Sequence, residues 1–415
     1  LSCTYTAKSS VSRTQLGTTQ GGFVGYGFVQ EIIGEHAEGG KITYRYRTTD
    51  DLPDIVQREF PFPPSFEFDW GRGLLVEQKT YRNELGVFQP VSSIKNEYQN
   101  YAHNTGSFLG LSVGTRVQYP QQSAGGLVSM AYETGNGLLT LSKQTQKTYD
   151  PENSTRFQEV VTDYTYASSA HVFPTKTETA NSNGDVIETI SKYPPDYATP
   201  HTIVADLVSR NRIAETIERI TNANGTVAQA VAKKFEYHSS ISRIFQTEDY
   251  AYESDGTAIF TPSTDGYSFP SYQRKNIMTY DINGILREAQ REENAKVVYL
   301  WGYNQTVPIA RIINADLASV ETVFTMQELS DIKGNTYLNN DVGLRTILNK
   351  LRNDVLLPDA MVTTYTYDPL VGLTSMTDEN GITIHYEYDQ HNRLERIKDF
   401  DENKIREFDY QYGNN

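Results

Sequence analysis

Two short stretches of the sequence carry residue types at spacings that could do chemistry. The first, GLSVG at residues 110–114, fits the G-x-S-x-G pattern, in which a strained strand-to-helix turn presents a nucleophilic serine. The flanking residues, NTGSFLG before and TRVQYPQQ after, favour a strand on both sides of Ser112. A serine hydrolase therefore stays an alternative function, to be decided by whether a histidine lies within hydrogen-bond reach of the Ser112 hydroxyl.

The second stretch, DFDEN at residues 399–403, opens like the D-x-D-x-N of a calcium loop. An EF-hand loop needs glycine at its sixth position and glutamate at its twelfth, but this chain has Lys404 and Tyr410 there. We interpret DFDEN as an acidic hairpin turn, with loose calcium binding by surface carboxylates as the alternative. The seven histidines form no H-E-x-x-H pair, and no phosphate-binding or dinucleotide motif occurs. We predict no metal, no cofactor and no catalytic residue.

Composition favours strands with one solvated face. The chain of 415 residues has 29 Tyr against 17 Phe and 2 Trp, and its mean hydropathy is −0.54. Tyrosine is common in strands and can pack its ring while its hydroxyl stays in water. The net charge of −15 repels phosphate backbones, and there is no basic patch, so we expect no nucleic-acid partner. No apolar run reaches the roughly 20 residues that span a bilayer.

Cys3 is the single cysteine, which excludes an intrachain disulfide and a cysteine metal cage. Its context, LSC, is that of a lipoprotein whose cleaved signal leaves an acylated cysteine, and an ordinary strand cysteine is the alternative. Since the sequence starts with Leu1 and not Met, we expect a fragment of a longer protein, or a mature form without its targeting segment.

Turn signals divide the chain into alternating segments. Asn-Gly and Asp-Gly pairs, which tolerate the positive φ of tight hairpin turns, begin at residues 136, 183, 224, 255, 265, 283 and 380. In the segment 382–389, Ile382, Ile384, Tyr386 and Tyr388 alternate with polar residues, as in a half-buried strand. The pattern predicts hairpin after antiparallel hairpin.

Two segments depart from this pattern. Residues 199–211 place apolar side chains at helical spacing. Between 316 and 357 the turn pairs stop, and ADLASVETVFTMQEL and VGLRTILNKLRNDVL both show the three-to-four spacing of a helix. We predict a two-helix insertion there, which Pro358 helps to end.

One phrase near the end of the chain is written twice. YTYD at 365–368 is followed 21 positions later by YEYD at 386–389. Residues two apart on a strand share a face, so we expect both tyrosines of each phrase on one side. We also expect equivalent tyrosines to lie side by side in neighbouring hairpins, as cross-strand pairs worth roughly 0.2–1 kcal/mol each.

Each phrase ends in an aspartate that we expect to hydrogen-bond the amides of its turn. Gly372-Leu373 aligns with Arg393-Leu394, which restarts the return strand. Such a unit cannot bury its face alone and needs stacked neighbours. The residues that we predict to be structural in the repeats are Tyr365, Tyr367, Asp368, Tyr386, Tyr388, Asp389, Arg393 and Leu394.

At this point the chain resembles the YD-repeat, or Rhs-like, surface proteins of the Bacteroidota type. PFPPSFEFDWGRGLLVEQKTY at 61–81, VVYLWGYNQTVPIARIINA at 297–315, and the segments 192–220 and 357–415 carry the resemblance. It implies β-hairpin strips that form broad sheets, export, and a place at the cell surface. In better-known relatives such sheets close into a hollow shell around a toxin. Those relatives have more repeats and a core before a variable tail, so we expect no complete shell from this chain alone.

We therefore predict an all-β fold of tandem β-hairpins with a small two-helix insertion. The predicted segments are an N-terminal β segment (1–60), a hairpin-rich region (61–315), the helical insertion (316–357) and the C-terminal YD repeats (358–415). The predicted function is a non-catalytic structural and interaction scaffold, the C-terminal part of a larger exported, outer-membrane-associated surface protein.

Two alternatives stand beside the scaffold and the serine hydrolase. One is an adhesin module that binds glycans or proteins on the same sheets, and the other is a fragment of a toxin-delivery shell. The expected partners are other surface or outer-membrane proteins, the missing part of the same chain, or glycans, with no transmembrane segment.

Overall fold

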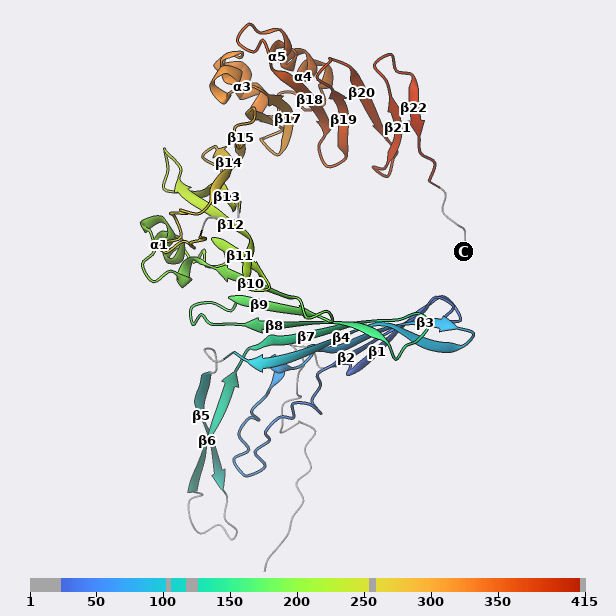
Figure 1. Ribbon diagram of the computed structural model, residues 1–415, viewed down its shortest axis with the longest axis vertical. Coiled ribbons are helices and arrows are strands. Elements are labelled where there is room, and N and C mark those ends of the chain that lie inside the picture. Colours follow the sequence, from blue (N-terminus) through green and yellow to red (C-terminus); the bar gives the residue numbers. More distant parts are fainter. Residues whose placement is uncertain (1–23, 102–105, 117–125, 254–258, 411–415) are drawn as a thin grey trace, which may run out of the picture. The chain divides into compact units, whose positions relative to one another are not determined.

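The computed structural model describes residues 24–101, 106–116, 126–253 and 259–410 (Figure 1). The chain divides into two compact units. Unit 1 comprises Leu1–Asp196 and Arg219–Ala228, and unit 2 comprises Tyr197–Glu218 and Gln229–Asn415. Both units consist mainly of antiparallel strands with a few short helices, which confirms the predicted fold class.

In unit 1, consecutive strands of one sheet pair antiparallel, and one hairpin stands apart. The sheet strands are β1 (Phe28–Ile33), β2 (Gly40–Tyr46), β3 (Leu75–Glu84), β4 (Val87–Asn100), β7 (Leu139–Tyr149), β8 (Phe157–Thr165), β9 (Lys176–Asn181) and β10 (Val186–Lys192). Between β4 and β7, β5 (Gly106–Arg116) and β6 (Gly126–Asn136) pair only with each other and leave the sheet (Figure 1). We call this hairpin the arm.

Unit 2 repeats the same hairpin order. Its strands are β13 (Ile244–Tyr252), β14 (Gln273–Tyr280), β15 (Leu286–Arg291), β16 (Val297–Gly302), β17 (Val307–Ile313), β18 (Met361–Asp368), β19 (Gly372–Thr377), β20 (Thr383–Tyr388), β21 (Leu394–Lys398) and β22 (Lys404–Glu407). Each pairs antiparallel with the next. β11 (Glu218–Ala223) and β12 (Thr226–Tyr237) contribute residues to both units.

Helices occur where the spacing predicted them, but the insertion holds more than the two that were predicted. α1 (Thr202–Ser209) confirms the helix predicted within 199–211. The insertion contains α2 (Leu317–Thr322), α3 (Met326–Lys333), α4 (Asp341–Leu348) and α5 (Lys350–Asn353). Thr325 and Glu328 form a capping box that starts α3 anew, and Asn349 ends α4 and begins α5. Apolar spacing continues through such caps, so it could not reveal them.

The insertion covers one face of β16, β17 and β18 in unit 2 (Figure 1). Its leucines pack on strand residues that are all nearly inaccessible to solvent. These core residues include Val298, Leu300, Ile309, Ile312, Val362, Leu344, Leu348 and Leu351. Two arginines fix the helices on β19. Arg345 donates to the Ser375 hydroxyl (3.0 Å), and Arg352 donates to the Thr377 carbonyl (3.0 Å).

This core predicts that Leu348→Ala destabilises unit 2 by about 2–5 kcal/mol, because Leu348 is fully buried and its loss leaves a cavity. Val342→Ala on the same helix is the matched control, since Val342 is 67% exposed. Urea denaturation followed by the fluorescence of Trp301, in a Trp70→Phe background, measures the change. Equal effects of the two substitutions would contradict this packing.

Candidate functional site

Ser112 lies in the middle of a regular strand. β5 is 11 residues long, Ser112 is opposite Met130, and its hydroxyl donates to the Pro61 carbonyl at 3.2 Å. A nucleophile elbow requires a sharp turn between a strand and a helix, and the chain has neither turn nor helix here. The local geometry does not present Ser112 as a nucleophile.

The calcium-like stretch is a hairpin turn between β21 and β22. The Asp399 carboxylate accepts hydrogen bonds from the Asn403 backbone (2.8 Å) and from its side-chain amide (3.1 Å). Across the described ranges, no three His, Cys, Asp or Glu side chains come together as metal ligands. Cys3 lies outside the described residues, so its lipidation stays a prediction.

What recurs in both units is a β-bulge beside a strand-end tyrosine. On the return strand one extra residue follows a leucine, and the register shift places that leucine opposite the tyrosine. Five hairpins share this arrangement. The pairs are Tyr46–Leu75, Tyr98–Leu141, Tyr280–Leu286, Tyr367–Leu373 and Tyr388–Leu394.

The carbonyl oxygen of each of these leucines accepts a hydrogen bond from an aromatic side chain that follows later in the chain. We call this contact the latch. The latches are Tyr98 to Leu75 (2.8 Å), Tyr166 to Leu141 (3.0 Å), Trp301 to Leu286 (2.7 Å), Tyr388 to Leu373 (3.1 Å) and Tyr410 to Leu394 (3.0 Å). The first two lie in unit 1 and the other three in unit 2.

The physical chemistry of a bulge explains the latch. A bulge interrupts the ladder of backbone hydrogen bonds, and a buried carbonyl without a partner is costly. An aromatic ring with a polar tip can fill the space beside the bulge and donate to that carbonyl. Burial raises the pKa of Tyr98, Tyr166 and Tyr388, so these phenols keep the proton that they donate.

Tyr98 and Tyr388 take part in two hairpins each. Tyr388 on β20 stands opposite Leu394 on β21 and donates to Leu373 on β19. Tyr98 on β4 joins β3 and β7 in the same way. One side chain thus ties three consecutive strands, which is how a stack of repeats that touch only their neighbours becomes continuous.

The aspartate of the YD phrase shapes the turn between tyrosine and leucine. The Asp389 carboxylate accepts hydrogen bonds from the backbones of His391 (2.8 Å) and Arg393 (3.0 Å), and from the Arg393 guanidinium (2.7 Å). The bond from the guanidinium comes first among the causes that lower the pKa of Asp389 to about 2. Asn392, the fourth residue of the turn, has a φ of 60°.

The same five-residue turn starts at Asn181, Asp281 and Asp378. In each, the side chain accepts from the third and fifth residues, and the fourth is a glycine at φ of 81–90°. The Asn-Gly pairs at 183, 283 and 380 are therefore the third and fourth residues of this turn. The Asn-Gly pairs were recognised in the sequence, but the Asp or Asn that begins each turn, two residues before the pair, was not.

Asp368 behaves differently from Asp389. Pro369 follows it and Leu370 takes the positive φ of 71°, so the turn has another shape. In this turn the backbone carbonyl of Asp368 accepts a hydrogen bond from the Val371 amide (3.0 Å). Within the described part of the chain, its carboxylate accepts no hydrogen bond.

The predicted side-by-side pairing of repeat tyrosines is wrong. Tyr365 on β18 is opposite Met376, and Tyr386 on β20 is opposite Ile397. Twenty-one residues contain two strands, so β19 separates the two tyrosines by about 10 Å at the usual spacing of strands. The tyrosines Tyr365, Tyr367, Tyr386 and Tyr388 are all half-buried in their strands.

Comparisons with known proteins agree with the repeat at the C-terminal end. Residues 371–404 match the family described as RHS Repeat. Of the solved structures, the chain is similar to TcdB2-TccC3-TEV (8% identity, TM-score 0.47), covering 93% of this chain and 21% of that one. A porin-like protein from Bacteroides uniformis ATCC 8492 also matches (8% identity, TM-score 0.20, 90% and 92% covered). No curated protein matches the chain.

The latch predicts that Tyr388→Phe weakens the local stability of β19 and β20 by about 0.5–1.5 kcal/mol, since the Leu373 carbonyl loses its donor. Hydrogen exchange of the backbone amides of these strands measures it. Tyr386→Phe on the same strand is the matched control, because the Tyr386 hydroxyl makes no hydrogen bond within the described residues. Equal protection in both variants would refute a stabilising latch.

The Asp389 turn predicts a dependence on acid pH. The pKa of Asp389 is about 2 in the folded chain and about 3.9 in an unfolded one, so its stabilisation is present above pH 4 and disappears as the pH falls toward 2. Asp389→Asn should lower the melting temperature at pH 7 and have little effect near pH 2. Thermal unfolding by circular dichroism tests this, with Asp401→Asn in the next turn as control. A difference that persists at pH 2 would contradict the assignment.

Proposed function

We propose that this Rhs-like chain is a structural and interaction scaffold, part of a larger exported bacterial surface protein built from YD repeats. The observation that carries the proposal is the latch. The same aromatic-to-carbonyl contact recurs in both units, and each copy joins one strand to its neighbour. A contact repeated in this way serves the continuity of a sheet, whereas a catalytic group acts at a single place.

The groups that suggested chemistry also serve the scaffold. The Ser112 hydroxyl holds the arm to the Pro61 carbonyl, and the Asp399 carboxylate closes a turn. The carboxylate of Asp389 closes another turn. These side chains thus have structural partners, in agreement with a role that depends on shape.

We place the scaffold at the cell surface in this proposal. The match of residues 371–404 to the RHS repeat supports this location. Among the helices that the structure describes, none has the length and apolar character to cross a bilayer. Acylation of Cys3 would supply a membrane anchor for such a chain. The partners are other surface or outer-membrane proteins, or further parts of the same polypeptide.

Surface shaving with proteinase K on intact host cells, followed by cross-linking of the intact protein in its cell envelope, tests the proposal. We expect the chain to be cleaved on intact cells and cross-linked in stoichiometric amounts to a protein, which mass spectrometry identifies. A protected chain that fractionates with the cytoplasm would overturn the proposed location. Recovery of polysaccharide with no cross-linked protein would contradict the scaffold role and favour the alternative function, a glycan-binding adhesin module.

A further inference from the structure

In the arm of unit 1 and at its contacts with the preceding loop, aromatic rings lie directly on the backbone of glycines. At four glycines of the arm or next to it, a Cβ atom would stand within 2.6 Å of a ring, so glycine is needed for this close approach. The pairs are Gly110–Tyr132, Gly114–Phe60, Gly135–Phe66 and Gly137–Trp70. The rings are thereby positioned before any ligand arrives.

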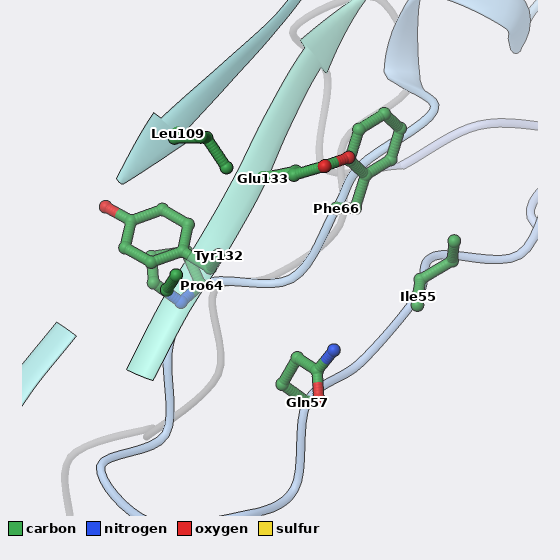
Figure 2. A pocket seen from close by; sticks show the side chains of 8 residues that line it. Ile55, Gln57, Pro64, Phe66, Leu109, Tyr132 and Glu133 are labelled. Carbon is green, nitrogen blue, oxygen red and sulfur yellow. The ribbon is translucent and has the colours of Figure 1, made fainter. Parts of the chain in front are cut away.

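A cavity of about 310 Å³ lies between β6 and the loop that carries Phe66 (Figure 2). Ile55 and Phe66 close the base of this loop by exchanging two backbone hydrogen bonds, each 3.0 Å long. Figure 2 shows Glu133 reaching toward the ring of Phe66, with Tyr132 and Leu109 on the other side of the cavity. The volume is at the lower end for ligand sites in proteins and suits one large side chain.

The polar groups at this cavity have no partner within the described residues. The carboxylate of Glu133 and the amide of Gln57 are exposed to solvent and the ring of Tyr132 is half-buried, and the polar atoms of these three side chains make neither hydrogen bonds nor ion pairs there. Glu133 is the single charged side chain among the lining residues. An exposed carboxylate beside aromatic rings offers a site for a cationic side chain, because a guanidinium can bond the carboxylate while it stacks on a ring.

An aliphatic stripe continues from the cavity along the arm. Leu109, Leu111 and Val113 alternate along β5 and so share one face, and they are 78%, 63% and 54% exposed. Leu109 also lines the cavity. On β6, Leu127 is 77% exposed and stands opposite Thr115, which is on the same face. We call the cavity and this stripe together the arm surface.

We propose that the arm surface binds a segment of a protein partner, which places an arginine or lysine side chain in the cavity against Glu133 and aliphatic side chains on the stripe. The charge of the cavity selects the basic residue, and the stripe supplies apolar contact beside it. Arginine, tyrosine and tryptophan are enriched among the residues that dominate binding at protein interfaces. A second copy of this chain fits less well, since it would bring another acidic surface and a net charge of −15.

This inference rests on the proposed interaction role and names the chemistry of the partner. It is tested in vitro, so its failure is distinct from a failure of the surface location. A library of random dodecapeptides displayed on phage is selected on the immobilised intact chain. Selected peptides are then synthesised with a fluorescent label and titrated with the chain by anisotropy.

We expect selected peptides to contain an arginine or lysine next to leucine, isoleucine or valine. Glu133→Gln should weaken their binding at least tenfold, and Leu111→Ser should weaken it several-fold. Glu152→Gln, an exposed carboxylate at the β7–β8 turn of the same unit, is the matched control and should leave binding unchanged. Fluorescence of Trp70 verifies that each variant keeps the fold around the arm.

Three outcomes would overturn the proposal. The first is selection of peptides without a basic residue, and the second is binding that Glu133→Gln does not alter. The third is a different ligand class, tested with choline and with maltohexaose as defined probes. If either small molecule binds the cavity in a Glu133-dependent manner while the basic peptides do not, the site belongs to a small cation or a glycan.

Discussion

The hydrogen bond from an aromatic side chain to the leucine carbonyl beside a bulge is the contact on which the sheets depend. A hairpin of two strands is marginal in water and becomes stable only when further strands join it. The bulge twists the strand pair and disturbs its ladder at the same place in each of the five hairpins that share it. Because the next strand supplies the missing donor, a local defect becomes the point at which two repeats are joined. Tyr388 shows this directly, since it lies between its own leucine and the preceding one.

This contact also explains why tyrosine, and not phenylalanine, occupies four of the five latch positions. Phenylalanine would fill the space beside the bulge but would leave the carbonyl without this donor, at a cost of about 0.5–1.5 kcal/mol. Trp301, one of only two tryptophans, takes the same role with its indole N–H, so the requirement is a ring with a donor at its tip. The aspartates that follow Tyr280 and Tyr388 accept hydrogen bonds from the amides of their turns. The leucine comes six positions after the tyrosine at Tyr280, Tyr367 and Tyr388.

Sequence patterns were sufficient for local structure and insufficient for contacts between strands. Alternation and the turn pairs at 183, 283 and 380 predicted hairpins, and apolar spacing predicted α1 and the insertion. The pairs at 136 and 265 are not hairpin turns, since β6 pairs with β5 and not with β7, and residue 265 lies in the loop between β13 and β14. The predicted pairing of Tyr365 with Tyr386 was wrong because one repeat of 21 residues contains two strands. Equivalent tyrosines therefore lie two strands apart in the sheet and are not neighbours. The latch joins residues 15–25 positions apart, as in Trp301 to Leu286 or Tyr166 to Leu141, and no local periodicity reports it. The cavity at Glu133 forms between the arm and the loop that carries Phe66, which are distant in the sequence, so it too was invisible there.

Insertions leave the latch register intact, and this separates the sheet from the proposed binding surface. Leu141 still stands opposite Tyr98 although the whole arm lies between them, and Leu75 stands opposite Tyr46 across the loop that contains Phe66. The bond from the Tyr101 amide to the Leu138 carbonyl (2.8 Å) closes the base of the arm. The hairpin can therefore lengthen at its turn without disturbing its bulge. In unit 1 the two lengthened turns meet and form the arm surface, so sequence change there can alter the proposed binding surface while the latches preserve the sheet.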